Sequence, residues 1–229
     1  MNNIISVKSL YKTYRTKDVE TPVLRGIDLE VPEGEFLGIM GKSGAGKSTL
    51  MYQIGLLDHP SEGEIILNNI NTEKLDTEER TDMRLAILGY VFQDYALIPE
   101  LSASENIMIP LLMQGKSFQD AKAISEDTLA KVGLAHRKEN KPSQLSGGEQ
   151  QRVSIARAIA HNPRILFADE PTANLDSISG QSIIELFKDL HSRGQTIVMV
   201  THEDEYAKYC NRIVHLEDGK IVRQNIQKQ

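Results

Sequence analysis

FLGIMGKSGAGKST, residues 36–49, determines what kind of protein this chain can form. Its first part, Phe36–Met40, is continuously apolar, which is typical of a strand buried on both faces. Gly41–Thr49 matches the P-loop pattern, in which a glycine-rich turn ends in Lys and Ser or Thr. Apolar residues at helical spacing follow at Leu50, Met51 and Ile54. The order strand, loop, helix predicts an α/β fold.

The loop chemistry predicts a nucleotide-phosphate site. Glycines allow backbone N–H groups to converge on phosphate oxygens, and the positive end of the following helix faces the anion. Lys47 is suited to the outer phosphates and Ser48 to a magnesium ion. A chance glycine-rich turn is the alternative, but the flanking strand and helix favour the site. The expected binding residues are Gly41, Lys42, Ser43, Gly44, Ala45, Gly46, Lys47, Ser48 and Thr49.

Three further apolar runs predict more buried strands, and polar residues follow each of them: Gly89–Phe92 precedes Gln93, Ile165–Ala168 precedes Asp169 and Glu170, and Ile197–Val200 lies just before His202. Parallel strands buried on both faces deliver such residues to one edge of the sheet, where open α/β sheets bind ligands. Taken singly, a glutamine or a histidine at such a position is usually structural, and an ordinary Asp-Glu-Pro loop is the less favoured alternative for Asp169 and Glu170.

Each of these polar residues suits a step of phosphoryl transfer. Asp169, Ser48 and Gln93 are the expected metal ligands, and Glu170 is suited to polarise an attacking water. His202 can contact the terminal phosphate. The expected catalytic group is Glu170, His202, Lys47 and Gln93.

The remaining segments predict one domain, 1–229, with an insertion. Residues 4–14 and 23–31 alternate as antiparallel strands joined by a turn at Lys17 and Asp18. Residues 97–160 read as an inserted helical subdomain, and 1–96 with 161–229 as the nucleotide-binding core. Within the insertion, Ser117 and Asp120 predict a capping box for a helix that ends at Gly133. Ile183, Leu186, Phe187 and Leu190 predict another helix.

A second helix start lies at Leu145–Arg152, LSGGEQQR. Ser146 and the glycines after it would let a ligand oxygen approach bare N–H groups, although such a sequence is also a common helix cap. The residues expected to bind there are Ser146, Gly147, Gly148 and Glu149.

Composition narrows the remaining classes. The 229 residues carry 26 Lys and Arg against 32 Asp and Glu, a net charge of −6, which disfavours nucleic acid as a main partner. The single cysteine, Cys210, excludes an internal disulfide and fits a reducing compartment. No apolar run approaches the ~20 residues that a membrane span needs. The amino terminus lacks a secretory pattern, so the mature chain is expected to start at Met1.

Taken in order, these motifs resemble the nucleotide-binding subunits of ABC transporters. Gly41–Thr49 resembles Walker A, Gln93 the Q-loop residue, Leu145–Gln150 the signature, Ile165–Asp169 Walker B with Glu170 as its carboxylate, Ala173–Asp176 the D-loop and His202 the switch histidine. The amino-acid sequence of these motifs is most similar to that of the lipoprotein-release, macrolide-export and peptide-export branch. Ala173 and Glu149 depart from the residues that relatives often have, Gly and Gln.

The resemblance implies an ATP hydrolase that uses ATP and Mg²⁺ in a head-to-tail homodimer, with Ser146 and Gly148 of one copy covering ATP on the P-loop of the other. It also implies an aromatic residue stacked on adenine, for which Tyr14 is preferred to Tyr11; packing within the sheet is the alternative reading of Tyr14.

A separate integral membrane permease is the implied partner, with Tyr95, Leu97 and Ile98 as contacts or, alternatively, as packing residues of the helical part. The implied location is cytoplasmic, peripheral on the inner face of the membrane. The expected role is export or extraction of a lipid-linked, peptide or drug-like substrate. The alternative is a regulatory ATPase of the cell-division type that signals through a membrane partner without transport. A soluble protein acting on DNA or ribosomes is disfavoured.

Overall fold

The computed structural model describes residues 2–17 and 19–227. The expected chain start at Met1, and Asp18 of the predicted turn, lie outside the described residues. None of the helices in the described ranges combines the length and the apolar character needed to cross a membrane.

A six-stranded sheet forms the centre of the molecule, in the order β10-β9-β3-β8-β7-β6. All neighbouring strands are parallel except the β9–β10 hairpin. The four predicted buried strands are confirmed as β3, β6, β7 and β8, whereas β9 and β10 were not predicted. The bounds are β3 (Phe36–Met40), β6 (Leu88–Val91), β7 (Ile165–Asp169), β8 (Thr196–Val200), β9 (Arg212–Glu217) and β10 (Lys220–Ile226).

A separate antiparallel sheet is built mainly from the amino-terminal residues, in the order β2-β1-β4-β5. The two predicted strands are confirmed as β1 (Asn3–Arg15) and β2 (Glu20–Pro32), and they pair antiparallel. The short strands β4 (Glu62–Leu67) and β5 (Ile70–Asn71) complete the sheet. Apolar side chains from both sheets, among them Ile5, Leu37 and Val198, share one buried cluster.

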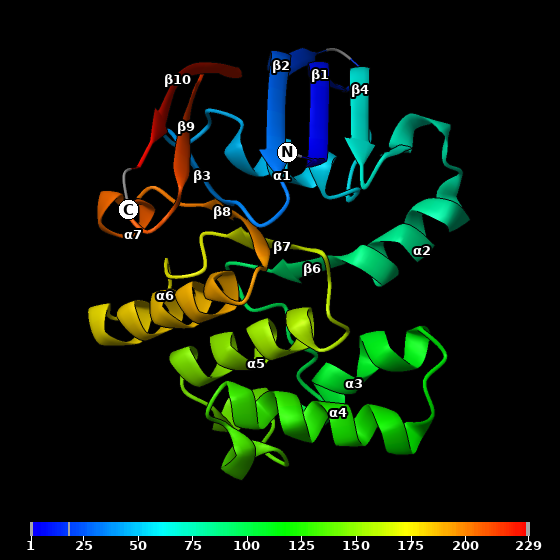
Figure 1. Ribbon diagram of the computed structural model, residues 1–229, viewed down its shortest axis with the longest axis vertical. Helices are drawn as coiled ribbons and strands as arrows, with labels where there is room; N and C mark the ends of the chain where they lie inside the picture. The colour runs from blue at the N-terminus through cyan, green and yellow to red at the C-terminus, as the bar shows by residue number, and fades with distance from the viewer. Residues whose placement is uncertain (1, 18, 228–229) are drawn as a thin grey trace.

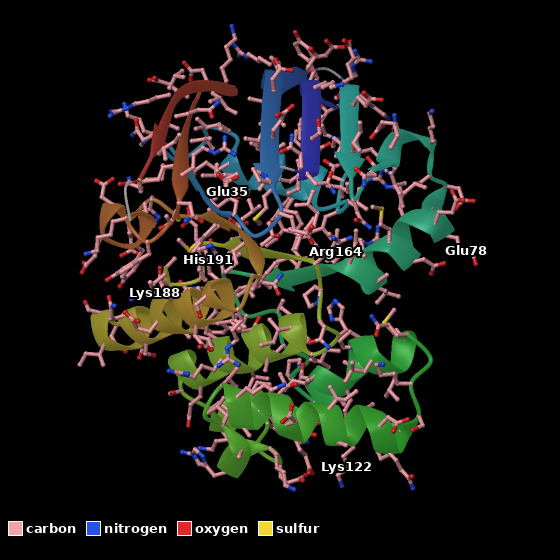
Figure 2. All side chains as sticks on the ribbon, in the orientation of Figure 1. Glu35, Glu78, Lys122, Arg164, Lys188 and His191 are labelled. Atoms are coloured by element: carbon pink, nitrogen blue, oxygen red, sulfur yellow. The ribbon has the colours of Figure 1, made fainter. Side chains whose placement is uncertain are left out.

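Helices surround the central sheet, and α3, α4 and α5 gather on the side away from the amino-terminal sheet (Figure 1). Their own apolar cluster includes Ile107, Leu129 and Val153. Charged side chains such as Glu78 of α2 and Lys122 of α4 point outward from the body (Figure 2). The helices are α1 (Lys47–Ile54), α2 (Thr77–Ile87), α3 (Ala103–Met113), α4 (Phe118–Lys131), α5 (Gly147–Ile159), α6 (Ser177–Ser192) and α7 (Asp204–Ala207).

The helix ends agree with most of the expected signals. Helix α4 begins after Ser117, whose side chain accepts from the Asp120 N–H, and Gly133 follows it with φ +79°. The full capping box predicted there is wrong, because the Asp120 carboxylate accepts from the Ser117 hydroxyl at 2.6 Å instead of from its backbone N–H. Helix α6 begins at Ser177, capped by Asp176, and so extends further toward the amino terminus than Ile183 indicated.

Candidate functional site

A pocket of about 670 Å³ lies over the loop that joins β3 to α1. Eight of the nine predicted P-loop residues line it, and Glu170 and His202 come to it from the ends of β7 and β8. The ninth, Ala45, is buried behind the loop. Val23 of β2 also lines the pocket; no sequence pattern indicates this role, because the residue lies far from the motif along the chain.

Backbone carbonyls of the P-loop hold the Lys47 side chain over the loop. Its Nζ donates to the carbonyl oxygens of Gly41 at 2.9 Å and Lys42 at 3.2 Å, and it lies 3.9 Å from Oε1 of Glu170. The side chain is 8% exposed, so this ammonium depends on these partners for the interactions that water would otherwise supply. The arrangement places a buried cation where anionic oxygens can replace the two carbonyls.

Glu170 joins Lys47 to His202. Its Oε2 lies 3.1 Å from Nδ1 of His202, while Oε1 faces the lysine. The residue has a left-handed backbone with φ +43°, which is unfavourable for a side chain with a Cβ. Two backbone hydrogen bonds hold it there, from the Glu170 N–H to Val200 and from Ala173 to the Glu170 carbonyl. The unusual conformation aims the carboxylate at the pocket.

Asp169 ends β7 and lies beside the start of α1. Its Oδ1 accepts from the Ser48 hydroxyl at 3.0 Å and its Oδ2 from the Tyr52 hydroxyl at 3.1 Å. Burial raises the pKa of the Asp169 carboxyl above its ordinary value, despite these hydrogen bonds. Burial and the nearby Asp169 raise the pKa of Tyr52 to about 12. Tyr52 was missed by the sequence analysis, although its position one helical turn after Ser48 places it on the same face.

Gln93 is not among the residues that line this pocket. It is exposed just after β6, and its backbone carbonyl accepts from Nδ2 of Asn174 at 2.9 Å. The structure therefore attaches the Gln93 segment to the Ala173–Asp176 loop. It does not place the amide beside Ser48 and Asp169.

Tyr14 is 42% exposed and lies against Asp58. Its hydroxyl donates to Oδ2 of Asp58 at 2.9 Å, and the ammonium of Lys12 lies 4.7 Å from its ring centroid. Burial raises the pKa of Tyr14, and Asp58 adds to the effect. Asp58 thus accepts hydrogen bonds from both Lys12 and Tyr14. This contact joins segments that are distant in the sequence, and no local pattern predicts it.

The signature residues lie away from this pocket. Ser146 caps α5, accepting from the Glu149 N–H, and Glu149 in turn accepts from the Ser146 N–H at 2.8 Å and from Nε of Arg137 at 2.9 Å. Of Ser146, Gly147, Gly148 and Glu149, none lines the pocket over the P-loop. Within one chain, Ser146 and Glu149 therefore serve as the cap of α5.

Tyr95, Leu97 and Ile98, which follow Gln93, were expected to be either permease contacts or packing residues of the helical part, and the structure places them in different surroundings. Leu97 packs against the α3–α5 cluster, as a packing residue would. Ile98 is 41% exposed, and the hydroxyl of Tyr95 faces the carbonyl of Asn174.

A P-loop after a buried parallel strand, with a lysine against a carboxylate from a neighbouring strand end, defines the P-loop class of nucleoside-triphosphate-binding proteins. The family comparison narrows the class, since the pattern of the ABC transporter family matches residues 24–173. The chain therefore belongs to the ABC transporter family, and it is an ATP hydrolase of the ABC type.

Individual relatives agree over nearly the whole chain. The lipoprotein-releasing system ATP-binding protein LolD of Aquifex aeolicus is 45% identical over 222 residues, covering 97% of this chain and 97% of the relative. The macrolide export ATP-binding/permease protein MacB of Chlorobium luteolum is 44% identical over 96% of this chain, which spans only 33% of that protein. A dimeric structure of the ATP-binding cassette MJ0796 bound to ADP and Pi matches with TM-score 0.91 at 41% identity, covering 98% and 99% of the two chains.

Proposed function

We propose that the chain hydrolyses ATP as one half of a head-to-tail pair of identical subunits, and that the pair drives a separate integral membrane permease. One observation carries the proposal: the pocket joins Lys47, Glu170 and His202 through direct contacts, whereas the signature residues of the same chain lie elsewhere. A pocket of this kind needs a second surface to cover its ligand. The dimeric MJ0796 cassette supports a second copy as that surface.

In the proposed complex the P-loop holds the triphosphate. Its backbone N–H groups and the amino-terminal end of α1 supply positive charge toward the phosphates. Lys47 exchanges the carbonyls of Gly41 and Lys42 for oxygens of the terminal phosphate. Tyr14 stacks its ring on the adenine. The ring is available for this contact because Tyr14 remains 42% exposed although the Lys12 ammonium lies near it.

The donor set beside α1 fits Mg²⁺. A hydroxyl and a carboxylate from Ser48 and Asp169 already lie 3.0 Å apart, and hard oxygen ligands are those that magnesium prefers. A nearby cation would also favour the charged form of Asp169, which burial disfavours. When bound, the ion would neutralise charge on the phosphate oxygens. Gln93 remains the proposed third ligand and catalytic group, and reaching this site requires its side chain to move from its exposed position.

For hydrolysis, Glu170 orients the attacking water and accepts its proton. Lys47 remains against the terminal phosphate and offsets its developing negative charge. His202 holds the Glu170 carboxylate through Nδ1 and turns its other ring edge toward the phosphate. The water oxygen attacks the γ-phosphorus in line while the bond to the β–γ bridging oxygen breaks and ADP leaves, with the reacting groups held by the ends of three neighbouring strands.

The second half-site comes from the partner copy. Ser146 caps a helix whose first residues are glycines, so that N–H groups there are open to an approaching phosphate. We assign Ser146, Gly147, Gly148 and Glu149 to the ATP held by the other P-loop. Because ATP then contacts both subunits, its binding stabilises the dimer. Hydrolysis removes part of these contacts and weakens the dimer. The residues 97–160 that carry this half-site form the proposed helical subdomain, and 1–96 with 161–229 form the proposed nucleotide-binding core.

A groove of about 390 Å³ between α2, α3 and β6 is the proposed docking site of the permease. Apolar side chains, including Leu57, Ile109 and Met113, line it, and Phe92 and Ala96 connect it to the Gln93 segment. Movement of that segment on ATP binding would therefore reach the groove. Docking there places the chain at the cytoplasmic face of the membrane. The LolD and MacB relatives support export or extraction of a lipid-linked, peptide or drug-like substrate.

Mixing two inactive variants tests the head-to-tail pair. In a mixed dimer of Lys47→Ala and Gly148→Asp chains, one composite site carries both defects and the other carries none. We expect ATPase activity to return on mixing. Mixing Lys47→Ala with Glu170→Gln is the matched control and restores nothing, because both changes damage the P-loop half. Equal activity of the two mixtures would disprove the shared site.

The docking groove has a matched pair of exposed residues. Met113 is 61% exposed and lines the groove, whereas Phe118 is 65% exposed and does not. We expect Met113→Glu, but not Phe118→Glu, to stop co-purification of a multi-spanning membrane protein identified by mass spectrometry. In liposomes holding that complex, movement of substrate across the bilayer together with substrate-stimulated ATPase activity would indicate transport. ATPase stimulation without movement of substrate would favour the regulatory role.

A further inference from the structure

We propose that the β9–β10 turn positions the nucleotide pocket, with Gly219 setting the place of both the P-loop and Val23. The inference rests on the proposed function, because it concerns the same pocket. It assigns a role to the carboxy-terminal hairpin, which lies outside every motif identified in the sequence.

Backbone hydrogen bonds join the turn to two distant segments. The Gly219 N–H donates to the carbonyl of Ala45 at 3.2 Å, and the Gly219 carbonyl accepts from the Arg25 N–H at 2.9 Å. Ala45 lies in the P-loop and Arg25 in β2. One residue therefore ties the last hairpin of the sheet to the phosphate loop and to the strand that carries Val23.

Packing at Gly219 leaves no room for a side chain. The residue is buried with φ +76°, and a Cβ added there would lie 2.1 Å from the Val23 carbonyl oxygen. A Cβ on Gly46 would lie 3.2 Å from the same carbonyl oxygen. Val23 is thus packed against two glycines, one from the turn and one from the P-loop. Because the nearest atoms are backbone, no rotamer change can relieve a clash at Gly219.

The consequence of such a clash follows from this arrangement. A side chain at 219 displaces the Val23 backbone, and with it a wall of the pocket and the contact with Gly46, or it moves the turn and lengthens its bond to Ala45. The first P-loop residue is also packed against the hairpin, since a Cβ on Gly41 would lie 2.3 Å from the Leu216 carbonyl oxygen. A misplacement of ~1 Å in such a site can reduce activity ~10²-fold.

Gly219→Ala and Gly133→Ala form a matched pair. Gly133 has φ +79°, and a Cβ there meets nothing within 4 Å, so the two variants share the backbone strain and differ in the clash. The affinity for ATP is measured with a fluorescent analogue, together with KM, kcat and Tm. We expect Gly219→Ala to raise the Kd for ATP and KM by ~10-fold and to lower kcat/KM by up to ~10²-fold, the cost of a misplaced site. Gly133→Ala is expected to lower Tm and leave Kd unchanged.

Hydrogen exchange of the wild-type chain gives a test that does not depend on a variant folding. We expect added ADP to slow exchange of the Gly219 amide, which donates to Ala45, while the Gly194 amide in the turn before β8 exchanges as before. An unchanged rate at Gly219, with P-loop amides protected, would overturn the inference.

The outcomes separate this inference from the proposed function. If the wild-type chain binds no ATP, the proposed function fails first. If it binds ATP and the two glycine variants have the same Kd, only the positioning role is wrong.

Discussion

The carboxylate of Glu170 lies between two basic side chains, with His202 Nδ1 3.1 Å from Oε2 and Lys47 Nζ 3.9 Å from Oε1. The side chain is 20% exposed, so water can reach it from the pocket. A carboxylate fixed on both oxygens but open to solvent is well placed to take a proton from water.

Glu170→Gln tests that role. The amide keeps the shape and cannot accept the proton, so we expect turnover to fall ~10²- to 10⁴-fold while ATP binding persists. ATP-bound dimers are expected to accumulate on size-exclusion chromatography. Glu205→Gln, an exposed change in α7, is the control. Undiminished turnover in Glu170→Gln would remove Glu170 from the mechanism.

His202→Ala tests whether the histidine acts through Glu170. We expect kcat to fall by a smaller factor than in Glu170→Gln, because the carboxylate keeps its other partner. In the double variant the two losses are expected not to add, since both act on one group. Steady-state kinetics of the four proteins in this cycle give the coupling. Fully additive losses would show that His202 works independently.

Asp169→Asn has a pH-dependent effect on stability. Burial raises the Asp169 pKa in the folded state, so the free energy of unfolding decreases as the pH rises from the unfolded pKa through the folded one. Asn carries no charge, so we expect the nucleotide-free variant to have a higher Tm than the wild type near neutral pH. Calorimetry at several pH values checks this.

The gain in Asp169→Asn is expected to vanish below the unfolded pKa of about 3.9, where both states are protonated. Asp204→Asn, on the exposed start of α7, is the matched control. The same Tm gain at all pH values would contradict the prediction. Loss of a charged ligand also predicts weaker binding of ATP in Mg²⁺, measured against ATP alone.

Tyr14→Ala and Tyr11→Ala test the adenine contact. Both tyrosines are 42% exposed, so the pair controls for loss of surface area. Removing a ring stacked on a base weakens binding by ~1–3 kcal/mol, and we expect this loss in Tyr14→Ala only. Tyr14→Phe keeps the ring, loses the bond to Asp58 and is expected to bind ATP almost normally. Equal losses in the two alanine variants would favour the packing interpretation.

The sequence predicted best what is encoded within a few residues. Local patterns alone predicted the strand Phe36–Met40 and the loop after it. Asp169, Glu170 and His202 were assigned to the site because each follows a buried apolar run. Parallel strands then bring such strand ends together without further information. The strands β4, β9 and β10 were not predicted: β4 and β10 have few or no buried side chains, and polar residues interrupt the apolar ones of β9, so none of the three forms a continuous apolar run.

Interactions between distant segments could not be predicted. Asp58 meets Tyr14 and Lys12 only after β1 pairs in its sheet, and Val23 reaches the pocket because β2 lies against the P-loop. Gln93 is the reverse case. Its position after a strand predicted a metal ligand, yet its side chain is exposed in the structure. Strand order and loop path decide these cases, and neither is written in a local motif.

The left-handed backbone at Glu170 sets stability against activity. Glycine would adopt φ +43° without the ~1–2 kcal/mol that a side chain costs there. Selection for heat resistance alone would therefore favour losing the carboxylate, and with it the chemistry. An engineer who screens libraries of this protein by thermal survival would enrich inactive clones at this position, so a useful screen must also demand turnover.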